Sequence, residues 1–207
     1  MFEGLDGAGK STQVNSLADF LEDQGETVTI SRWNSGKMSE MIKEYKNKIS
    51  MNPKIYSLTH ALDLIERYDD EIVPALDRDE VVICDRYFFT SYVRDSLRKS
   101  DIDHKNIFSN LRKPDIIFYL KANPRLCVER IKNRGSISYY AAGMDLFLSH
   151  DQDENLEQYF DLMNKEYDSL LKDDKTTYII KSNREPKKIS EDINKIVNNF
   201  LNGRKKS

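Results

Sequence analysis

Residues 4–11 form a glycine-rich run that ends in Gly-Lys-Ser, and a helical pattern begins at its lysine. The spacing matches G-x-x-x-x-G-K-[ST]. Gly4, Gly7 and Gly9 allow positive φ, so successive N–H groups can surround phosphate oxygens. The ammonium of Lys10 suits the β- and γ-phosphates, and the hydroxyl of Ser11 suits Mg²⁺. The run therefore predicts a nucleotide phosphate site, with an ordinary glycine-rich turn before a helix as the alternative.

The strand that should lead into this loop is short. Only Met1, Phe2 and Glu3 precede Gly4, whereas a strand normally has about five or six residues. We therefore expect a truncated first strand. Either the start codon lies upstream, or the chain has lost most of a strand that is usually central in such sheets.

Length and composition favour one domain over residues 1–207 with a sizeable core. The formal net charge of −3 argues against nucleic-acid or anionic-membrane partners. Two cysteines, Cys84 and Cys127, make neither a disulfide framework nor a metal site with the three scattered histidines. No apolar run approaches about 18 residues and no leader pattern is present, so a cytoplasmic location is expected.

Short apolar runs alternate with helical periodicity along the chain. Strands are expected at 1–3, 27–30, 81–84, 115–120 and 176–180, and helices at 10–24, 38–49, 52–76, 87–99, 103–111, 124–134, 154–171 and 186–201. This alternation predicts a three-layer α/β fold, with a parallel sheet of about five strands flanked by helices. Ligands of such sheets bind beyond the carboxyl ends of the strands. The weakly patterned stretch at about 135–152 is expected to be a lid.

A carboxylate and a guanidinium, Asp85 and Arg86, directly follow the strand at 81–84. Asp85 could hold Mg²⁺ through water, as an acidic residue at a strand end does in phosphate-loop enzymes. Arg86 offers a planar fork that matches a phosphate. The alternative is a local Asp–Arg surface pair.

Arg130 and Arg134 lie four residues apart, so they share one face of the helix expected at 124–134. Gly135 then begins the loop. Arginines at the base of a mobile loop can neutralise the charge of a transferring phosphoryl group. Lys132 is better explained as part of a solvated basic face.

Five sections of the chain, residues 2–13, 72–76, 82–87, 113–120 and 130–135, resemble the thymidylate kinases. The likeness covers nearly the whole chain and is most specific in the first 13 residues and around Asp85. It implies a P-loop kinase fold and a nucleoside monophosphate kinase that moves the γ-phosphoryl group of ATP–Mg²⁺ to a deoxynucleotide. By analogy it also implies a homodimer.

The resemblance also implies roles for single residues. Lys10 would steady the transferring phosphate, and Arg86 would clamp the acceptor phosphate. Because position 7 is glycine, the catalytic arginine would come from the lid, as Arg134. The implied catalytic residues are Lys10, Asp85, Arg86 and Arg134; the metal ligands Ser11 and Asp85; the ATP site Gly4, Asp6, Gly7, Ala8, Gly9, Lys10, Ser11, Thr12 and Arg130; and the acceptor site Asp6, His60, Arg67, Arg86, Tyr87 and Thr90.

Departures from the family pattern gather around the acceptor base. The base-stacking phenylalanine is replaced by His60, the base-reading arginine by Leu64, and a tyrosine by Arg94. Arg67, one helical turn along, could replace the missing arginine. Turnover of thymidylate is therefore expected to be weak or to depend on Arg67. A kinase of another phosphorylated acceptor and a non-catalytic ATP-binding protein remain alternatives.

Overall fold

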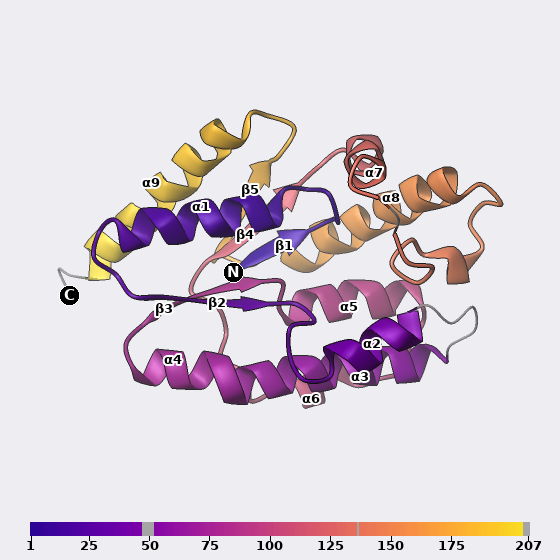
Figure 1. Ribbon diagram of the computed structural model, residues 1–207, viewed down its shortest axis with the longest axis horizontal. Coiled ribbons are helices and arrows are strands. Elements are labelled where there is room, and N and C mark those ends of the chain that lie inside the picture. Colours follow the sequence, from indigo (N-terminus) through magenta and orange to yellow (C-terminus); the bar gives the residue numbers. More distant parts are fainter. Residues whose placement is uncertain (47–51, 136, 205–207) are drawn as a thin grey trace.

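The computed structural model describes residues 1–46, 52–135 and 137–204. Five parallel strands form one sheet in the order β2-β3-β1-β4-β5 (Figure 1). The strands are β1 (Phe2–Gly4), β2 (Val28–Arg32), β3 (Val81–Asp85), β4 (Ile117–Lys121) and β5 (Thr177–Lys181). This sheet confirms the predicted α/β fold with a short first strand.

Helices cover both faces of the sheet. On one face lie α1 (Lys10–Glu22) and α9 (Pro186–Arg204), and on the other lie α3 (Pro53–Arg67), α4 (Val73–Asp77) and α5 (Phe88–Leu97) (Figure 1). The helix α8 (Gln152–Leu171) packs against both α5 and α7 (Pro124–Lys132). The remaining short helices are α2 (Ser39–Lys46), α6 (His104–Ile107), the π-helical η1 (Tyr68–Ile72) and the 3₁₀-helical η2 (Met144–Leu146). No described helix is long and apolar enough to cross a membrane.

Two helix predictions need correction. The helix predicted at 52–76 is divided into α3, the π turn η1 and α4. Pro74, at the start of α4, has no N–H to continue the hydrogen-bond ladder, which explains the break. The helix predicted at 103–111 is only four residues long in the structure. The last residues of the helix predicted at 38–49 lie outside the described ranges.

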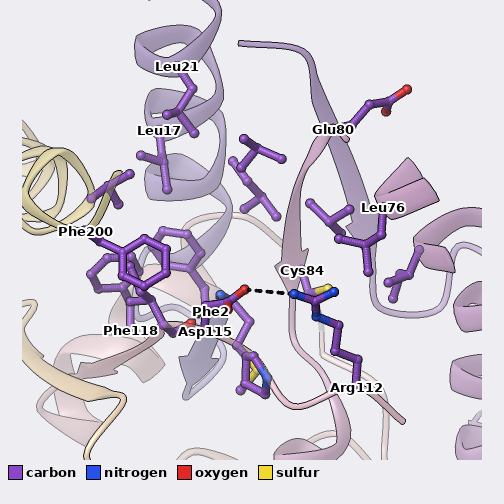
Figure 2. A pocket seen from close by; sticks show the side chains of 18 of the residues that line it. Phe2, Leu17, Leu21, Leu76, Glu80, Cys84, Arg112, Asp115, Phe118 and Phe200 are labelled. Atoms are coloured by element: carbon purple, nitrogen blue, oxygen red, sulfur yellow. Dashed lines mark hydrogen bonds and ion pairs between the residues drawn. The ribbon is translucent and has the colours of Figure 1, made fainter. Parts of the chain in front are cut away.

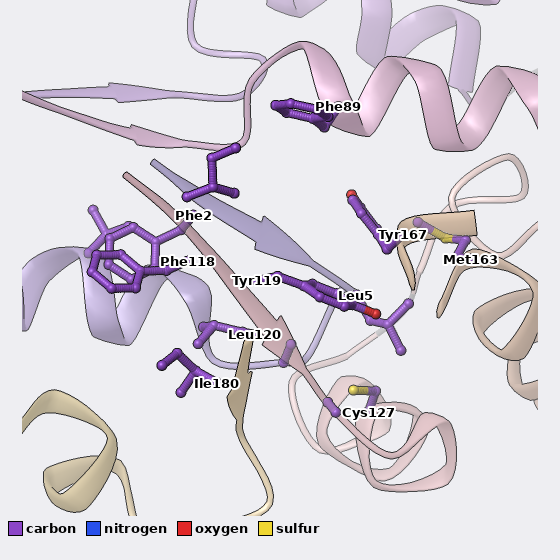
Figure 3. Close-up of a cluster of buried hydrophobic side chains, with 14 of the residues drawn as sticks. Phe2, Leu5, Phe89, Phe118, Tyr119, Leu120, Cys127, Met163, Tyr167 and Ile180 are labelled. Atoms are coloured by element: carbon purple, nitrogen blue, oxygen red, sulfur yellow. The ribbon is translucent and has the colours of Figure 1, made fainter. Parts of the chain in front are cut away.

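The main core lies between the sheet and its helices, and Figure 3 shows its centre. Phe2 of β1 packs against Phe118 of β4 with ring centroids 5.1 Å apart. On β4, Tyr119 stacks on Tyr167 of α8 at 5.2 Å. The first contact holds β1 against β4 and so fixes the start of the phosphate loop, and the second holds β4 against α8.

At the amino ends of the strands, the short β1 leaves a cavity of about 380 Å³. In the described sheet, Asp85 is the only β3 residue paired with β1, whereas β2 and β3 pair over five residues. Side chains from α1, α4, α9 and the central strands surround this space, including Phe2, Leu17, Leu21, Leu76, Phe118 and Phe200 (Figure 2). The ammonium of Met1 donates to Ile116 O at 2.8 Å, and its burial lowers the pKa of this amine.

Candidate active site

The phosphate loop packs tightly against the sheet. A Cβ on Gly4 (φ 132°) would lie 2.5 Å from Leu120 O, and one on Gly7 (φ 80°) would lie 2.8 Å from Cys127 O. Both positions therefore require glycine. The loop ends at the start of α1, where Gly9 supplies no side-chain cap. The first N–H groups of α1 are thereby left available to an anion.

Lys10 is buried and lies against its own loop. Its Nζ donates to Gly4 O at 3.2 Å and to Leu5 O at 2.7 Å. Burial, reinforced by the nearby charge of Arg86, lowers the pKa of Lys10 to about 8. A phosphate placed beside the ammonium would oppose this shift, since a negative charge favours the protonated form.

Ser11 and Asp85 meet across 74 positions of sequence. The Ser11 hydroxyl donates to Asp85 Oδ2 at 2.7 Å, and Arg32 Nη1 lies 4.0 Å from the same oxygen. A hydroxyl and a carboxylate are hard oxygen donors of the kind that Mg²⁺ prefers. The chemistry of these two donors therefore fits a magnesium ion.

Arg86 has a backbone conformation that non-glycine residues rarely adopt, with φ 72°. Its N–H donates to Phe2 O at 3.0 Å, which ties this turn to β1. The guanidinium donates to Gly4 O at 2.9 Å and to Asp6 Oδ1 at 2.6 Å. The strained turn therefore directs a charged fork back across the phosphate loop.

A buried network holds Arg86 in this position. Thr90 Oγ1 accepts from Arg86 Nη1 at 3.1 Å and lies 2.6 Å from Glu3 Oε2, to which it donates. Glu3 also accepts from the Tyr167 hydroxyl at 2.9 Å and from the Tyr87 N–H at 2.9 Å. Burial raises the pKa of Glu3. This buried network thus fixes the orientation of the Arg86 side chain.

The loop, the Ser11–Asp85 pair and the arginines line one cavity of about 500 Å³. Its lining comprises Asp6, Gly7, Gly9, Lys10, Ser11, Thr12, Arg32, Trp33, Asn34, Asp85, Arg86, Arg94, Ile131, Arg134, Ile137 and Ala141. Five cations against two carboxylates make it a site for phosphorylated ligands. The predicted Lys10, Ser11, Asp85, Arg86 and Arg134 are all brought together here.

Comparisons with known proteins agree with this geometry. A family model described as thymidylate kinase matches residues 2–193. The chain is 36% identical over 203 residues to a probable thymidylate kinase 2 of Saccharolobus solfataricus, covering 97% of this chain and 95% of the relative. A probable thymidylate kinase of Staphylothermus marinus is 30% identical over 200 residues, with coverage of 95% and 92%.

The chain belongs to the thymidylate kinase family. It is therefore an ATP-dependent phosphotransferase of the nucleoside monophosphate kinase type. The cavity lies at the carboxyl ends of the strands, the edge at which ligands of such sheets bind.

Seven residues of this lining were not predicted as site residues, and three of them carry a charge or an aromatic ring: Arg32, Trp33 and Arg94. Arg32 ends β2, so the rule that ligands bind beyond strand carboxyl ends could have found it. Arg94 lies eight residues after Arg86 on α5, and its Nη2 donates to Asp6 Oδ2 at 2.8 Å. No sequence pattern links Arg94 to Asp6.

Some predicted residues lie away from the cavity lining. His60 is 2% exposed and stacks on Trp33 with ring centroids 5.0 Å apart, and of the two only Trp33 lines the cavity. Arg67 is fully buried and donates to Asp63 Oδ2 at 3.0 Å and to Ser31 Oγ at 2.8 Å. Acceptor contacts by these two side chains stay a prediction.

Three other predicted residues also stand behind the cavity wall. Thr90 belongs to the network that positions Arg86. The Tyr87 side chain lines the cavity at the amino ends of the strands. Arg130 Nη1 donates to Gly7 O at 3.0 Å, so it supports the phosphate loop. Direct ligand contacts by these residues likewise remain predictions.

Most of the stretch predicted as a lid is bound to the helices beside it. Arg98 donates to both carboxylate oxygens of Asp145, at 2.8 and 2.9 Å, and to Tyr140 O at 2.8 Å. Asn155 accepts from the N–H groups of Leu148 and Ser149. The backbone from 140 to 149 is therefore fastened to α5 and α8, while the Arg134 side chain, before it, is exposed.

Proposed function

We propose that this kinase transfers the γ-phosphoryl group of ATP to dTMP. The observation that carries the proposal is one cavity that joins a phosphate loop, the Ser11–Asp85 pair and Arg86. The relatives named above supply the acceptor, because they are described as thymidylate kinases.

The donor side of the reaction belongs to the phosphate loop. The N–H groups at the start of α1 bind the phosphates of ATP. Lys10 leaves the carbonyl groups of Gly4 and Leu5 and turns to the β- and γ-phosphates, where its charge stabilises the transition state. Ser11 and Asp85 would hold Mg²⁺, which neutralises charge on the β- and γ-phosphates when bound.

The acceptor side is organised around Arg86, whose guanidinium clamps the acceptor phosphate in place of Asp6. Asp6 then meets the sugar hydroxyl or the metal shell. Arg134 reaches over the transferring group from the loop that follows α7. These residues would catalyse the reaction by positioning the two substrates and by stabilising negative charge, which is what phosphoryl transfer requires.

We propose that residues 1–207 are one domain and that about 135–152 close over bound nucleotides as a lid. Because 140–149 are fastened through Arg98 and Asn155, the movement concerns the residues around Arg134. Hydrogen exchange should slow there when both nucleotides bind. Equal exchange with and without ligand would remove Arg134 from its role.

The kinase is proposed to be a cytoplasmic homodimer. Ile55, Leu58 and Leu62 form an exposed apolar stripe along α3, each 44–48% exposed. Their spacing of three and four residues places them on one helix face, which suits a second copy of the chain. Leu58→Lys should convert a dimer into a monomer in light-scattering measurements, whereas a wild-type monomer would contradict the proposal.

A coupled ADP-release assay across nucleoside monophosphates tests the function. Turnover of dTMP above all other acceptors is expected, whereas its absolute rate, predicted from the sequence to be weak or to depend on Arg67, stays a prediction. A second candidate, a kinase of another phosphorylated acceptor, draws support from Trp33, because it stacks on His60 where the base was expected. Preferential turnover of another monophosphate would establish that candidate, and ATP binding without turnover would contradict both.

A further inference from the structure

Asp6 joins two buried guanidinium groups at the floor of the cavity. Its Oδ1 accepts from Arg86 Nη2 at 2.6 Å and its Oδ2 from Arg94 Nη2 at 2.8 Å. The two arginine side chains are 5% and 4% exposed, whereas that of Asp6 is 32% exposed. The carboxylate is thus the accessible member of the group, and it pairs with two guanidinium groups that are almost fully buried.

Arg94 has further capacity to bind an anion. Its Nη1 donates to the Tyr56 hydroxyl at 3.0 Å, but its buried Nε has no hydrogen-bond partner among the described residues. A buried donor without a partner is costly. A ligand oxygen that reached Nε would remove this cost, and Arg94 lines the cavity.

The charges around Asp6 are strongly coupled. Burial by itself would raise the pKa of the Asp6 carboxyl, but Arg86, Arg94 and Lys10 outweigh burial and hold this pKa well below its ordinary value. Asp6 therefore stays ionised and partly neutralises both arginines. A dianionic phosphate offers more charge and more acceptor oxygens than one carboxylate.

We propose that Arg94 is a second ligand of the acceptor phosphate, and that Arg86 and Arg94 form a two-guanidinium site which Asp6 occupies until the phosphate displaces it. This inference rests on the proposed function and adds to it a residue that determines specificity. It makes the phosphate, rather than the base, the main determinant of acceptor binding. It also gives a reason for an arginine at position 94.

The test compares dTMP with thymidine, which differ only in the phosphate. Calorimetry with a non-hydrolysable ATP analogue in the donor site gives both dissociation constants, and their ratio measures phosphate recognition. Arg94→Gln should lower the preference for dTMP roughly tenfold or more, because it removes charged hydrogen bonds. Thymidine affinity should not change. Arg112→Gln, at the opposite end of the sheet with a half-exposed side chain, is the matched control and should leave the ratio unchanged.

Asp6→Asn tests displacement itself. Removing the competing carboxylate should increase the preference for dTMP over thymidine, and any contact of Asp6 with the sugar cancels in the ratio. A ratio within twofold of wild type for a folded Arg94→Gln protein, or a lower ratio for Asp6→Asn, would overturn the proposal. If Arg94→Gln does not fold, Arg94→Lys takes its place, and an unchanged ratio again overturns the proposal.

Failure of the proposed function has a different signature: the wild-type protein then turns over a monophosphate other than dTMP, or binds ATP and turns over none. The same ratio is then measured with that nucleotide and its nucleoside, so the role of Arg94 is decided independently of the base.

Discussion

The two ends of the central sheet are built for different purposes. At the carboxyl ends of the strands, a cavity of about 500 Å³ contains five cationic side chains and two carboxylates. At the amino ends, a cavity of about 380 Å³ is mainly surrounded by apolar side chains from the sheet and its helices. Loops and helix N-termini create the first site, whereas the short β1 leaves the second.

The difference separates the residues that bind ligands and catalyse the reaction from the residues that stabilise the fold. Substitutions at the carboxyl end should change catalysis and ligand affinity with little effect on folding. Substitutions at the amino end should change the free energy of unfolding and leave substrate affinity alone. Each prediction below tests one side of this contrast.

Lys10→Ala should have the largest effect. Turnover should fall roughly 10²- to 10³-fold, because the ammonium stabilises charge that develops in the transition state. Lys113→Ala at the amino end is the control and should retain full activity. Steady-state kinetics and circular dichroism measure activity and folding, and a Lys10→Ala protein that keeps a tenth of wild-type turnover would contradict the assignment.

Leu21→Ala tests the amino end. Leu21 is fully buried beside the apolar cavity, so its truncation enlarges an existing space and should reduce the free energy of unfolding by about 2–5 kcal/mol. KM for both substrates should stay unchanged. Ile179→Ala on β5, where the side chain is 54% exposed, should cost less than about 1 kcal/mol in denaturant titrations. Equal losses in the two variants would remove the distinction between core and surface here.

Arg86→Lys keeps the charge but loses the bidentate fork. Acceptor affinity should fall roughly tenfold or more, while ATP affinity should change less. Calorimetry with each nucleotide separately measures the two effects. Equal weakening of both nucleotides would place Arg86 outside the acceptor site.

Two buried amines, one at each end, should make stability rise with pH. A lowered pKa in the folded state means that the unfolded chain binds more protons, so the free energy of unfolding increases as pH rises. The amine of Met1 increases the free energy of unfolding between its lowered pKa and its ordinary pKa of 8.0. The amine of Lys10 does so between pH values of about 8 and 10.5. Denaturant titrations from pH 6 to 10 should show both windows. Lys10→Met should abolish the upper window only, and stability that falls with pH across both would contradict the assigned shifts.

Much of the fold followed from local patterns. Every predicted strand is present, with ends within two residues of those observed, because apolar runs between turn residues report burial in a parallel sheet directly. The division of the helix predicted at 52–76 was missed, although Pro74 was visible in the sequence. The strain at Arg86 could not be predicted, since it depends on the hydrogen bond to β1.

The amino-acid sequence by itself predicted the phosphate site. A glycine-rich loop before a helix, and a carboxylate at a strand end, carry their chemistry wherever a parallel sheet forms, which is why Ser11 and Asp85 meet as expected. Three contacts were decided only by the tertiary structure. Arg94 donates to Asp6, Trp33 stacks on His60, and Thr90 accepts a hydrogen bond from Arg86. The periodicity of a sequence shows which residues share one face of a helix, but it does not show which element packs against that face. Only tertiary packing decides this.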